Sequence, residues 1–202
     1  MESVRTTLIV LRRTDYRESD LIISGVSPDC GRLELIAGGA RKIGEKKFPV
    51  VDLFCELEIE YVPAEEGLAR LKAAELLTSF ANVADQMPIY RLAGKVAALV
   101  LKQTAPDLPM ALSYDALRNV LGNLALYAAG KPALWLPEAA GAVIKMVLLQ
   151  EAGLLPEFDQ PKVAALFDAV IEAGIGGEAL PEYPSAYWAE LSAYLNTLFP
   201  QN

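Results

Sequence analysis

The stretch that decides the fold is Leu8–Ala40, LIVLRRTDYRESDLIISGVSPDCGRLELIAGGA, in which three short apolar segments alternate with polar ones. Thr6–Arg12, Leu21–Val26 and Arg32–Ala37 are rich in β-branched and aliphatic residues, so each is predicted to form a strand. The segment SPDCG between the second and third strands contains the residues that favour a tight turn. The N-terminus is therefore predicted to contain three short strands of a small β-barrel.

Two further strands are predicted downstream. In Val50–Val62 apolar residues alternate with mostly acidic ones, which places one face on a core and an acidic face in water. A five-residue loop, 63–67, then leads into a fifth strand. If Val62 pairs with Leu68, the acidic strand faces two cations, with Glu60 opposite Arg70 and Glu58 opposite Lys72. This favours charge neutralisation over DNA contact for Arg70 and Lys72. Five short strands without helical insertions predict a small closed barrel or a sandwich.

From Phe80 onward the chain is rich in alanine and leucine and its periodicity becomes helical. Five helices with short loops predict an all-α bundle. The fold class is thus α+β, with a five-stranded β-barrel domain over residues 1–80 and a helical domain over 81–202. Ser113 is predicted to be the N-cap of the second helix. The predicted helices are Pro88–Gln103, a helix from Ser113 to about Ala129, Pro137–Ala152, Pro161–Ala173 and Pro184–Phe199.

Composition excludes several classes of protein. The 202 residues include no histidine and two cysteines, Cys30 and Cys55, which excludes histidine-dependent triads and a thiolate-rich zinc site. No nucleophile–base pair or phosphate-binding loop is visible, so we expect no enzymatic activity, no cofactor and no metal. No signal peptide is visible, and no apolar stretch approaches the ~20 residues that span a bilayer. We therefore expect a cytoplasmic protein without membrane association and with free thiols.

Charge is distributed unevenly along the chain. The net charge is −8, yet residues 1–50 hold nine Lys/Arg against seven Asp/Glu, while the remainder holds nine against nineteen. Cations gather in the loop 41–47, RKIGEKK, which suits sequence-independent contact with phosphates, although it also fits a plain solvated loop. Two more cations end the first strand on alternate faces, and the sequence leaves open which of them points outward. The candidate DNA-binding residues are Arg12, Arg13, Arg41, Lys42, Lys46 and Lys47.

Other residues of the first 50 support a mainly electrostatic interaction. Asp15, Glu18 and Asp20 surround Arg17 and are expected to form a charge-balanced turn rather than an acid–base or metal site. Aromatic residues on which bases stack are few. Tyr16 is expected to be exposed, and Phe48 is expected to pack on the barrel.

Several blocks of the sequence resemble one known family. LRRTDYRESD, GRLELIAGGARK, FPVVDLFCELEIEY and KAAELLTSF occur in this order, followed later by LLQEAGLLPEF. Their order and spacing resemble those of bacterial recombination mediators of the RecO family. The resemblance implies an OB-fold followed by a helical domain, binding to single- and double-stranded DNA, and annealing of complementary strands. It also implies partnership with RecR and with the acidic tail of single-stranded DNA-binding protein, in support of recombinase loading.

Two departures from the family pattern are visible. Asp159-Gln160-Pro161 follows the last block, where many members carry a four-cysteine zinc site, and Glu45 interrupts the basic loop. The alternative is therefore a protein-interaction adaptor on the same fold with weakened DNA binding. For an acidic tail, the candidate cations at a helical groove are Arg91, Lys95, Lys102, Arg118 and Lys145.

Overall fold

The structure is a computed structural model that describes residues 2–42, 48, 50–64 and 67–200. The chain divides into two compact units. The first comprises Met1–Ala81 and Ala97–Ala111, and the second comprises Asn82–Val96 and Leu112–Asn202. None of the helices in the described part of the chain is both long and apolar enough to cross a membrane.

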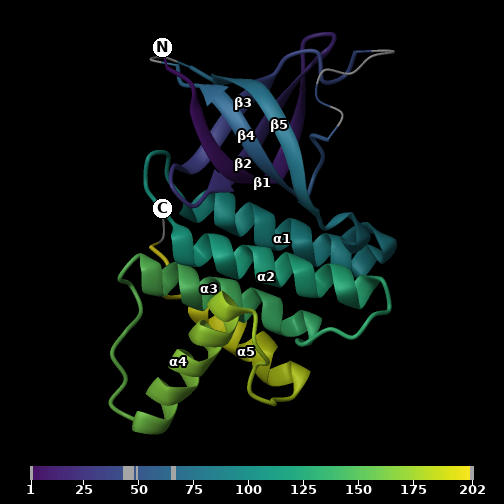
Figure 1. Ribbon diagram of the computed structural model, residues 1–202. Helices are drawn as coiled ribbons and strands as arrows, with labels where there is room; N and C mark the ends of the chain where they lie inside the picture. Colours follow the sequence, from purple (N-terminus) through teal and green to yellow (C-terminus); the bar gives the residue numbers. More distant parts are fainter. Residues whose placement is uncertain (1, 43–47, 49, 65–66, 201–202) are drawn as a thin grey trace. The chain divides into compact units, whose positions relative to one another are not determined.

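The first unit contains a closed five-stranded barrel (Figure 1). Its strands follow one another around the barrel in the order β1-β2-β3-β5-β4, and only β3 and β5 pair in parallel. The barrel and the helices that follow it confirm the predicted α+β class and the OB-fold. The strands are β1 (Val4–Tyr16), β2 (Asp20–Ser27), β3 (Gly31–Ala37), β4 (Cys55–Val62) and β5 (Ala69–Ser79).

The interior of the barrel is filled by the apolar residues that alternate along the strands. Leu8, Ile23, Leu35 and Leu57 are fully buried, and Leu71 of β5 packs into the same cluster. Neighbouring side chains on a strand point to opposite faces of the sheet, so the apolar residues all lie on one face. In the closed barrel this face is the interior.

The predicted pairing of β4 with β5 is wrong. Val62 lies opposite Arg70, and register shifts then place Glu60 opposite Ala73 and Glu58 opposite Glu75. Neither Arg70 nor Lys72 therefore faces the carboxylate assigned to it. The predicted fourth strand also begins later than expected, at Cys55.

Arg5 of β1 takes the role that was predicted for Arg70. Its guanidinium lies 3.2 Å from Glu60, the residue opposite it on β4. Hydrogen bonds from Ser3 and Arg5 lower the pKa of the Glu60 carboxyl. The acidic strand is thus neutralised from the β1 side of the barrel.

The β2–β3 turn packs against residues 101–110. Gly31 has a positive φ of 65°, and a Cβ there would lie 2.4 Å from the carbonyl oxygen of Ala105, so a side chain does not fit. Arg32 donates its backbone N–H to Ala105 and its side chain to the carbonyl of Leu101. The Met110 N–H donates in turn to the carbonyl of Pro28. These contacts explain why Ala97–Ala111 belongs to the barrel unit.

The helical part confirms the five predicted helices, with bounds that differ by a few residues (Figure 1). Among them, α3 is buried along most of its length, as its nearly continuous apolar sequence requires. The elements are η1 (Ala81–Asp85), α1 (Met87–Gln103), α2 (Ala111–Ala128), η2 (Pro137–Ala139), α3 (Ala140–Glu151), α4 (Pro161–Gly176) and α5 (Ser185–Asn196).

Ser113 is not the N-cap of α2, contrary to the prediction. The helix begins at Ala111, and the hydroxyl of Ser113 is buried without a hydrogen-bond partner in the described residues. Glu151, at the end of α3, accepts the N–H groups of Leu112 and Ser113 at 3.0 and 2.9 Å. A carboxylate from a distant helix thus satisfies donors that the first turn of α2 leaves open.

Candidate nucleic-acid interface

Three parts of the barrel meet at one end, which we call the loop end: the β1–β2 turn, the start of the β3–β4 connection and the start of β5. The N–H of Arg41 donates to the carbonyl of Ser19 at 2.8 Å, and the N–H of Gly39 donates to the Asp20 carboxylate at 2.9 Å. Ile36 near the end of β3 lies opposite Arg70 near the start of β5. The loop end is therefore a joined surface built from segments far apart in sequence.

Among the described residues, four exposed cations lie on this loop end. Arg17 is in the β1–β2 turn, Arg41 and Lys42 follow β3, and Arg70 begins β5. Hydrogen bonding by the Gly39 N–H is the main cause that lowers the pKa of Asp20, and the charges of Arg17 and Arg70 add to it. Both cations thus lie near the same carboxylate, which stays ionised at neutral pH.

Carboxylates compensate part of this positive charge. Arg41 forms an ion pair of 3.1 Å with Asp15 of β1. Asp20 is held by Gly39 and by the hydroxyl of Ser19. Two of the three acidic residues of the β1–β2 region, Asp15 and Asp20, are therefore held by partners at the loop end.

Arg12 and Arg13 both lie at the barrel surface, because β1 shifts register between Val10 and Arg12. Arg12 forms a 3.0 Å ion pair with Glu34 of β3 and also donates to the Ser24 hydroxyl. Arg13 reaches the opposite way and pairs with Asp52. The question left open by the sequence is thus settled by a bulge that exposes both side chains, each with a carboxylate partner.

Of the remaining candidates in the basic loop, Lys42 is described by the structure, whereas Lys46 and Lys47 are not. Lys42 is exposed and forms no ion pair with any residue that the structure describes. Lys46 and Lys47 lie outside the described residues. The structure therefore brings Arg41 and Lys42 to the loop end with two cations from other connections.

Arg17 and Arg70 were not among the sequence candidates. Arg17 was assigned to a balanced turn and Arg70 to the neutralisation of β4. Their positions in the sequence could have indicated both residues, because each lies in or beside one of the two loops that OB-folds use to contact oligonucleotides. Neither of them forms an ion pair within the described part of the chain.

In the described part of the loop end, one aromatic ring is in contact with a cation. Tyr16 is half-buried, with the Arg17 guanidinium 5.0 Å from its ring centroid. Phe48 is buried in the barrel, as predicted. Stacking on bases would therefore depend on Tyr16 and on guanidinium planes rather than on a row of aromatic rings.

No group of histidine, cysteine or carboxylate residues within the described ranges is arranged to hold a metal ion. Burial raises the pKa of the Cys55 thiol, which keeps it protonated and unreactive at neutral pH. The chemistry that the loop end supports is the binding of anions.

The barrel is similar to a known protein family. Residues 1–80 match the family described as Recombination protein O N terminal. A DNA repair protein RecO from Geobacter metallireducens is 31% identical over 124 residues, which cover 61% of this chain and 50% of that protein.

More distant relatives match over a longer part of the chain. A DNA repair protein RecO from Listeria monocytogenes is 25% identical over 152 residues, covering 75% of this chain and 56% of that protein. One from Myxococcus xanthus is 24% identical over 159 residues, covering 79% and 62%. The chain spans about half the length of the curated relatives that it matches.

Proposed function

We propose, from the match of residues 1–80 to the family described as Recombination protein O N terminal and from the similarity to RecO proteins, that the chain is a RecO-type, non-enzymatic DNA-binding mediator of DNA repair and recombination in the cytoplasm. The observation that carries the proposal is the convergence of Arg17, Arg41, Lys42 and Arg70 on the loop end of the barrel. Cations on neighbouring loops can follow a phosphate backbone without reading its sequence.

The finer parts of this proposal rest on the family. The chain binds single- and double-stranded DNA, anneals complementary strands and helps to load the recombinase onto single strands. Its protein partners are a RecR-type protein and the acidic tail of single-stranded DNA-binding protein. The names of the relatives support a role in DNA repair.

One of the five cations that were expected to contact the acidic tail at a helical groove is not available for this contact. Lys145 is only 9% exposed, and its ammonium donates to the carbonyl and hydroxyl of Ser192 on α5. It joins α3 to α5 and is not available at a groove. Arg91, Lys95, Lys102 and Arg118 remain candidates for this contact.

The test measures binding of a fluorescent single strand by anisotropy across a range of salt concentrations. Wild type should bind with an affinity that falls steeply with salt, by about 0.7 log units per tenfold salt for each phosphate neutralised. Replacing Arg41, Lys42, Lys46 and Lys47 together by alanine should weaken binding at low salt and flatten this slope.

A matched control removes the same number of cations elsewhere. Arg91, Lys95, Lys131 and Lys162 are exposed residues of the second unit, and their replacement by alanine should leave the affinity and the slope nearly unchanged. Equal losses in both variants, or an affinity that does not respond to salt, would overturn the proposal.

A protein-interaction adaptor on the same fold is the second candidate, and one observation favours it. Arg12, Arg13 and Arg41 are each paired with a carboxylate of the barrel, which reduces their attraction for phosphates. Under this hypothesis the wild type shows no salt-dependent binding of single strands, while binding of a protein partner persists.

A further inference from the structure

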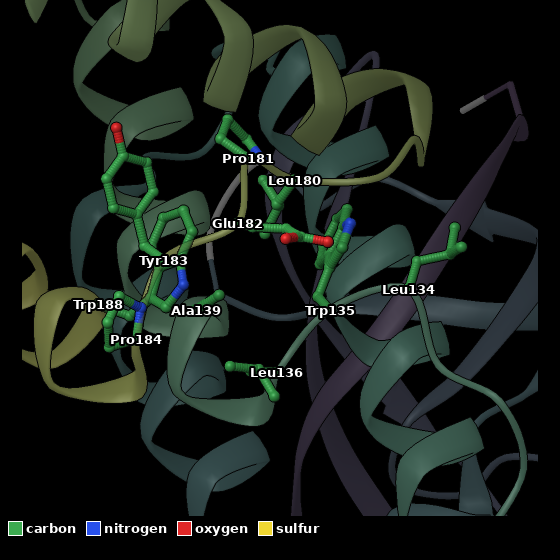
Figure 2. A pocket seen from close by; sticks show the side chains of 10 residues that line it. All are labelled: Leu134, Trp135, Leu136, Ala139, Leu180, Pro181, Glu182, Tyr183, Pro184 and Trp188. Carbon is green, nitrogen blue, oxygen red and sulfur yellow. The ribbon is translucent and has the colours of Figure 1, made fainter.

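The second unit contains a pocket of about 370 Å3 whose walls come from two connections between helices (Figure 2). One wall is the segment 134–139, between α2 and α3. The other is the segment 180–184, between α4 and α5, with Trp188 of α5. This volume lies within the range of pockets that bind peptides and small molecules.

The lining is apolar and rich in aromatic rings. Tyr183 stacks on Tyr187 at 4.3 Å between centroids and meets Trp188 edge-on at 6.1 Å. The indole N–H of Trp135 donates to the carbonyl of Glu178, which fixes the orientation of that ring. Leu134 remains 59% exposed at the rim. Trp135 and Trp188 are 5% and 2% exposed, so the surface open to a short apolar segment of another chain is formed by the exposed side chains of Leu134, Leu136 and Tyr183.

The polar features of the pocket restrict what can occupy it. Glu182 is the one charged residue among those that line it, and it forms no ion pair with any described residue. In the view of Figure 2 its carboxylate points across the pocket, from the 180–184 segment towards the wall that carries Trp135. An occupant that brings a cation would neutralise this carboxylate, whereas an acidic occupant would be repelled.

The backbone beside the pocket is also unpaired. Within the described residues, Ala179–Tyr183 donates and accepts no backbone hydrogen bond, and the segment is neither helix nor strand. Pro181 lacks an N–H group, so the segment offers alternating donors and acceptors to an extended peptide rather than a full strand edge.

We propose that this pocket is a docking site for an extended, apolar, proline-containing peptide of a partner protein that carries one lysine or arginine. The exposed side chains of Leu134, Leu136 and Tyr183 receive its apolar residues, next to the buried rings of Trp135 and Trp188. Glu182 pairs with its cation. The inference does not depend on DNA binding, and it concerns a surface distinct from the loop end.

The acidic tail of single-stranded DNA-binding protein does not fit this pocket. Its carboxylates would face Glu182 with no cation among the lining residues to compensate them. The pocket therefore discriminates between two peptide classes by the sign of their charge.

The chain offers a direct readout of occupancy. It contains two tryptophans, and both line this pocket. Three blocked peptides of sequence Pro-Leu-Pro-Leu-Pro-Xaa, with Xaa as Arg, Gln or Glu, are titrated into the full chain while tryptophan emission is followed. The Arg peptide should change the emission and bind about fivefold more tightly than the Gln peptide, the effect of one partly exposed ion pair. The Glu peptide should bind most weakly.

Variants then assign the effect to the pocket. Glu182→Gln should abolish the preference, and Glu182→Lys should reverse it in favour of the Glu peptide. Glu190→Lys makes the same charge change on an exposed part of α5 outside the pocket and should preserve the original order. Leu134→Ala should weaken all three peptides by about tenfold without changing their order, because it removes apolar contact alone.

Three outcomes of the peptide titrations would overturn the proposal. They are equal binding of the three peptides, no emission change with any of them, or tightest binding by the Glu peptide. An emission change with protein concentration alone would identify a second copy of the chain as the occupant and would also contradict it.

Discussion

Replacement of Glu151 by alanine should destabilise the protein by about 2 kcal/mol. The carboxylate accepts two N–H groups at the start of α2, those of Leu112 and Ser113. The first is exposed, so water replaces the lost acceptor and the cost is about 0.5 kcal/mol. The second belongs to a residue that is 1% exposed, so its loss costs about 1–2 kcal/mol. An anion in the last turn of a helix is unfavourable to the helix dipole, so its removal from α3 stabilises the folded protein by about a few tenths of a kcal/mol.

The assay is urea unfolding at neutral pH, with hydrogen exchange at the same two amides as a local readout. Glu151→Gln keeps one acceptor oxygen without the charge and should cost about half as much as the alanine variant. Ser113→Ala is the matched control, and it should cost nothing because the hydroxyl has no partner among the described residues. If Ser113→Ala is as destabilising as Glu151→Ala, the serine is the true cap and the reasoning fails.

Three more predictions concern the barrel and α3. Gly31→Ala should destabilise the protein by at least about 2 kcal/mol in urea, because φ is positive and the methyl group meets the carbonyl of Ala105; an unchanged midpoint would contradict the packing of this turn. Asp15→Asn should raise the affinity for single strands about twofold to threefold at low salt, because it releases Arg41, and anisotropy should show this gain vanish at high salt. Burial lowers the pKa of Lys145, so just below pH 10.5 the unfolded chain binds more protons than the folded one. Stability relative to Lys145→Met should therefore rise as the pH approaches 10.5, and urea curves of the two proteins that stay parallel there would refute it.

The elements that sequence predicts well are those whose signal is local. The strands of the barrel follow from alternation, and Leu8, Leu35 and Leu57 lie in the core as that period requires. Prolines and glycines place the ends of the helices to within a few residues. Gly177, for example, has a positive φ just beyond α4.

What sequence misses depends on partners far along the chain. The register between β4 and β5 shifts beside Glu56 and beside Glu60. A pairing that is inferred by counting residues outward from the connecting loop does not anticipate such bulges. The cap of α2 comes from Glu151, which no local capping pattern indicates.

The candidate interface was predicted in part for the same reason. Composition identified the basic loop, and Arg41 and Lys42 do lie on the loop end. Arg17 and Arg70 join them only because the barrel closes, and the carboxylates opposite Arg12 and Arg13 come from β3 and from the segment before β4. Charge counts along a chain cannot reveal such compensation, because it arises from tertiary pairing.

The barrel unit is not one continuous stretch of the chain, and this limits how it can be transferred between genes. A copy of the first 80 codons would leave behind the carbonyls of Leu101 and Ala105, to which Arg32 donates. The shortest segment that carries every partner of the β2–β3 turn ends near Ala111 and brings the whole of α1 with it. A fusion protein or an evolutionary rearrangement that preserves this barrel is therefore expected to inherit that helix as well.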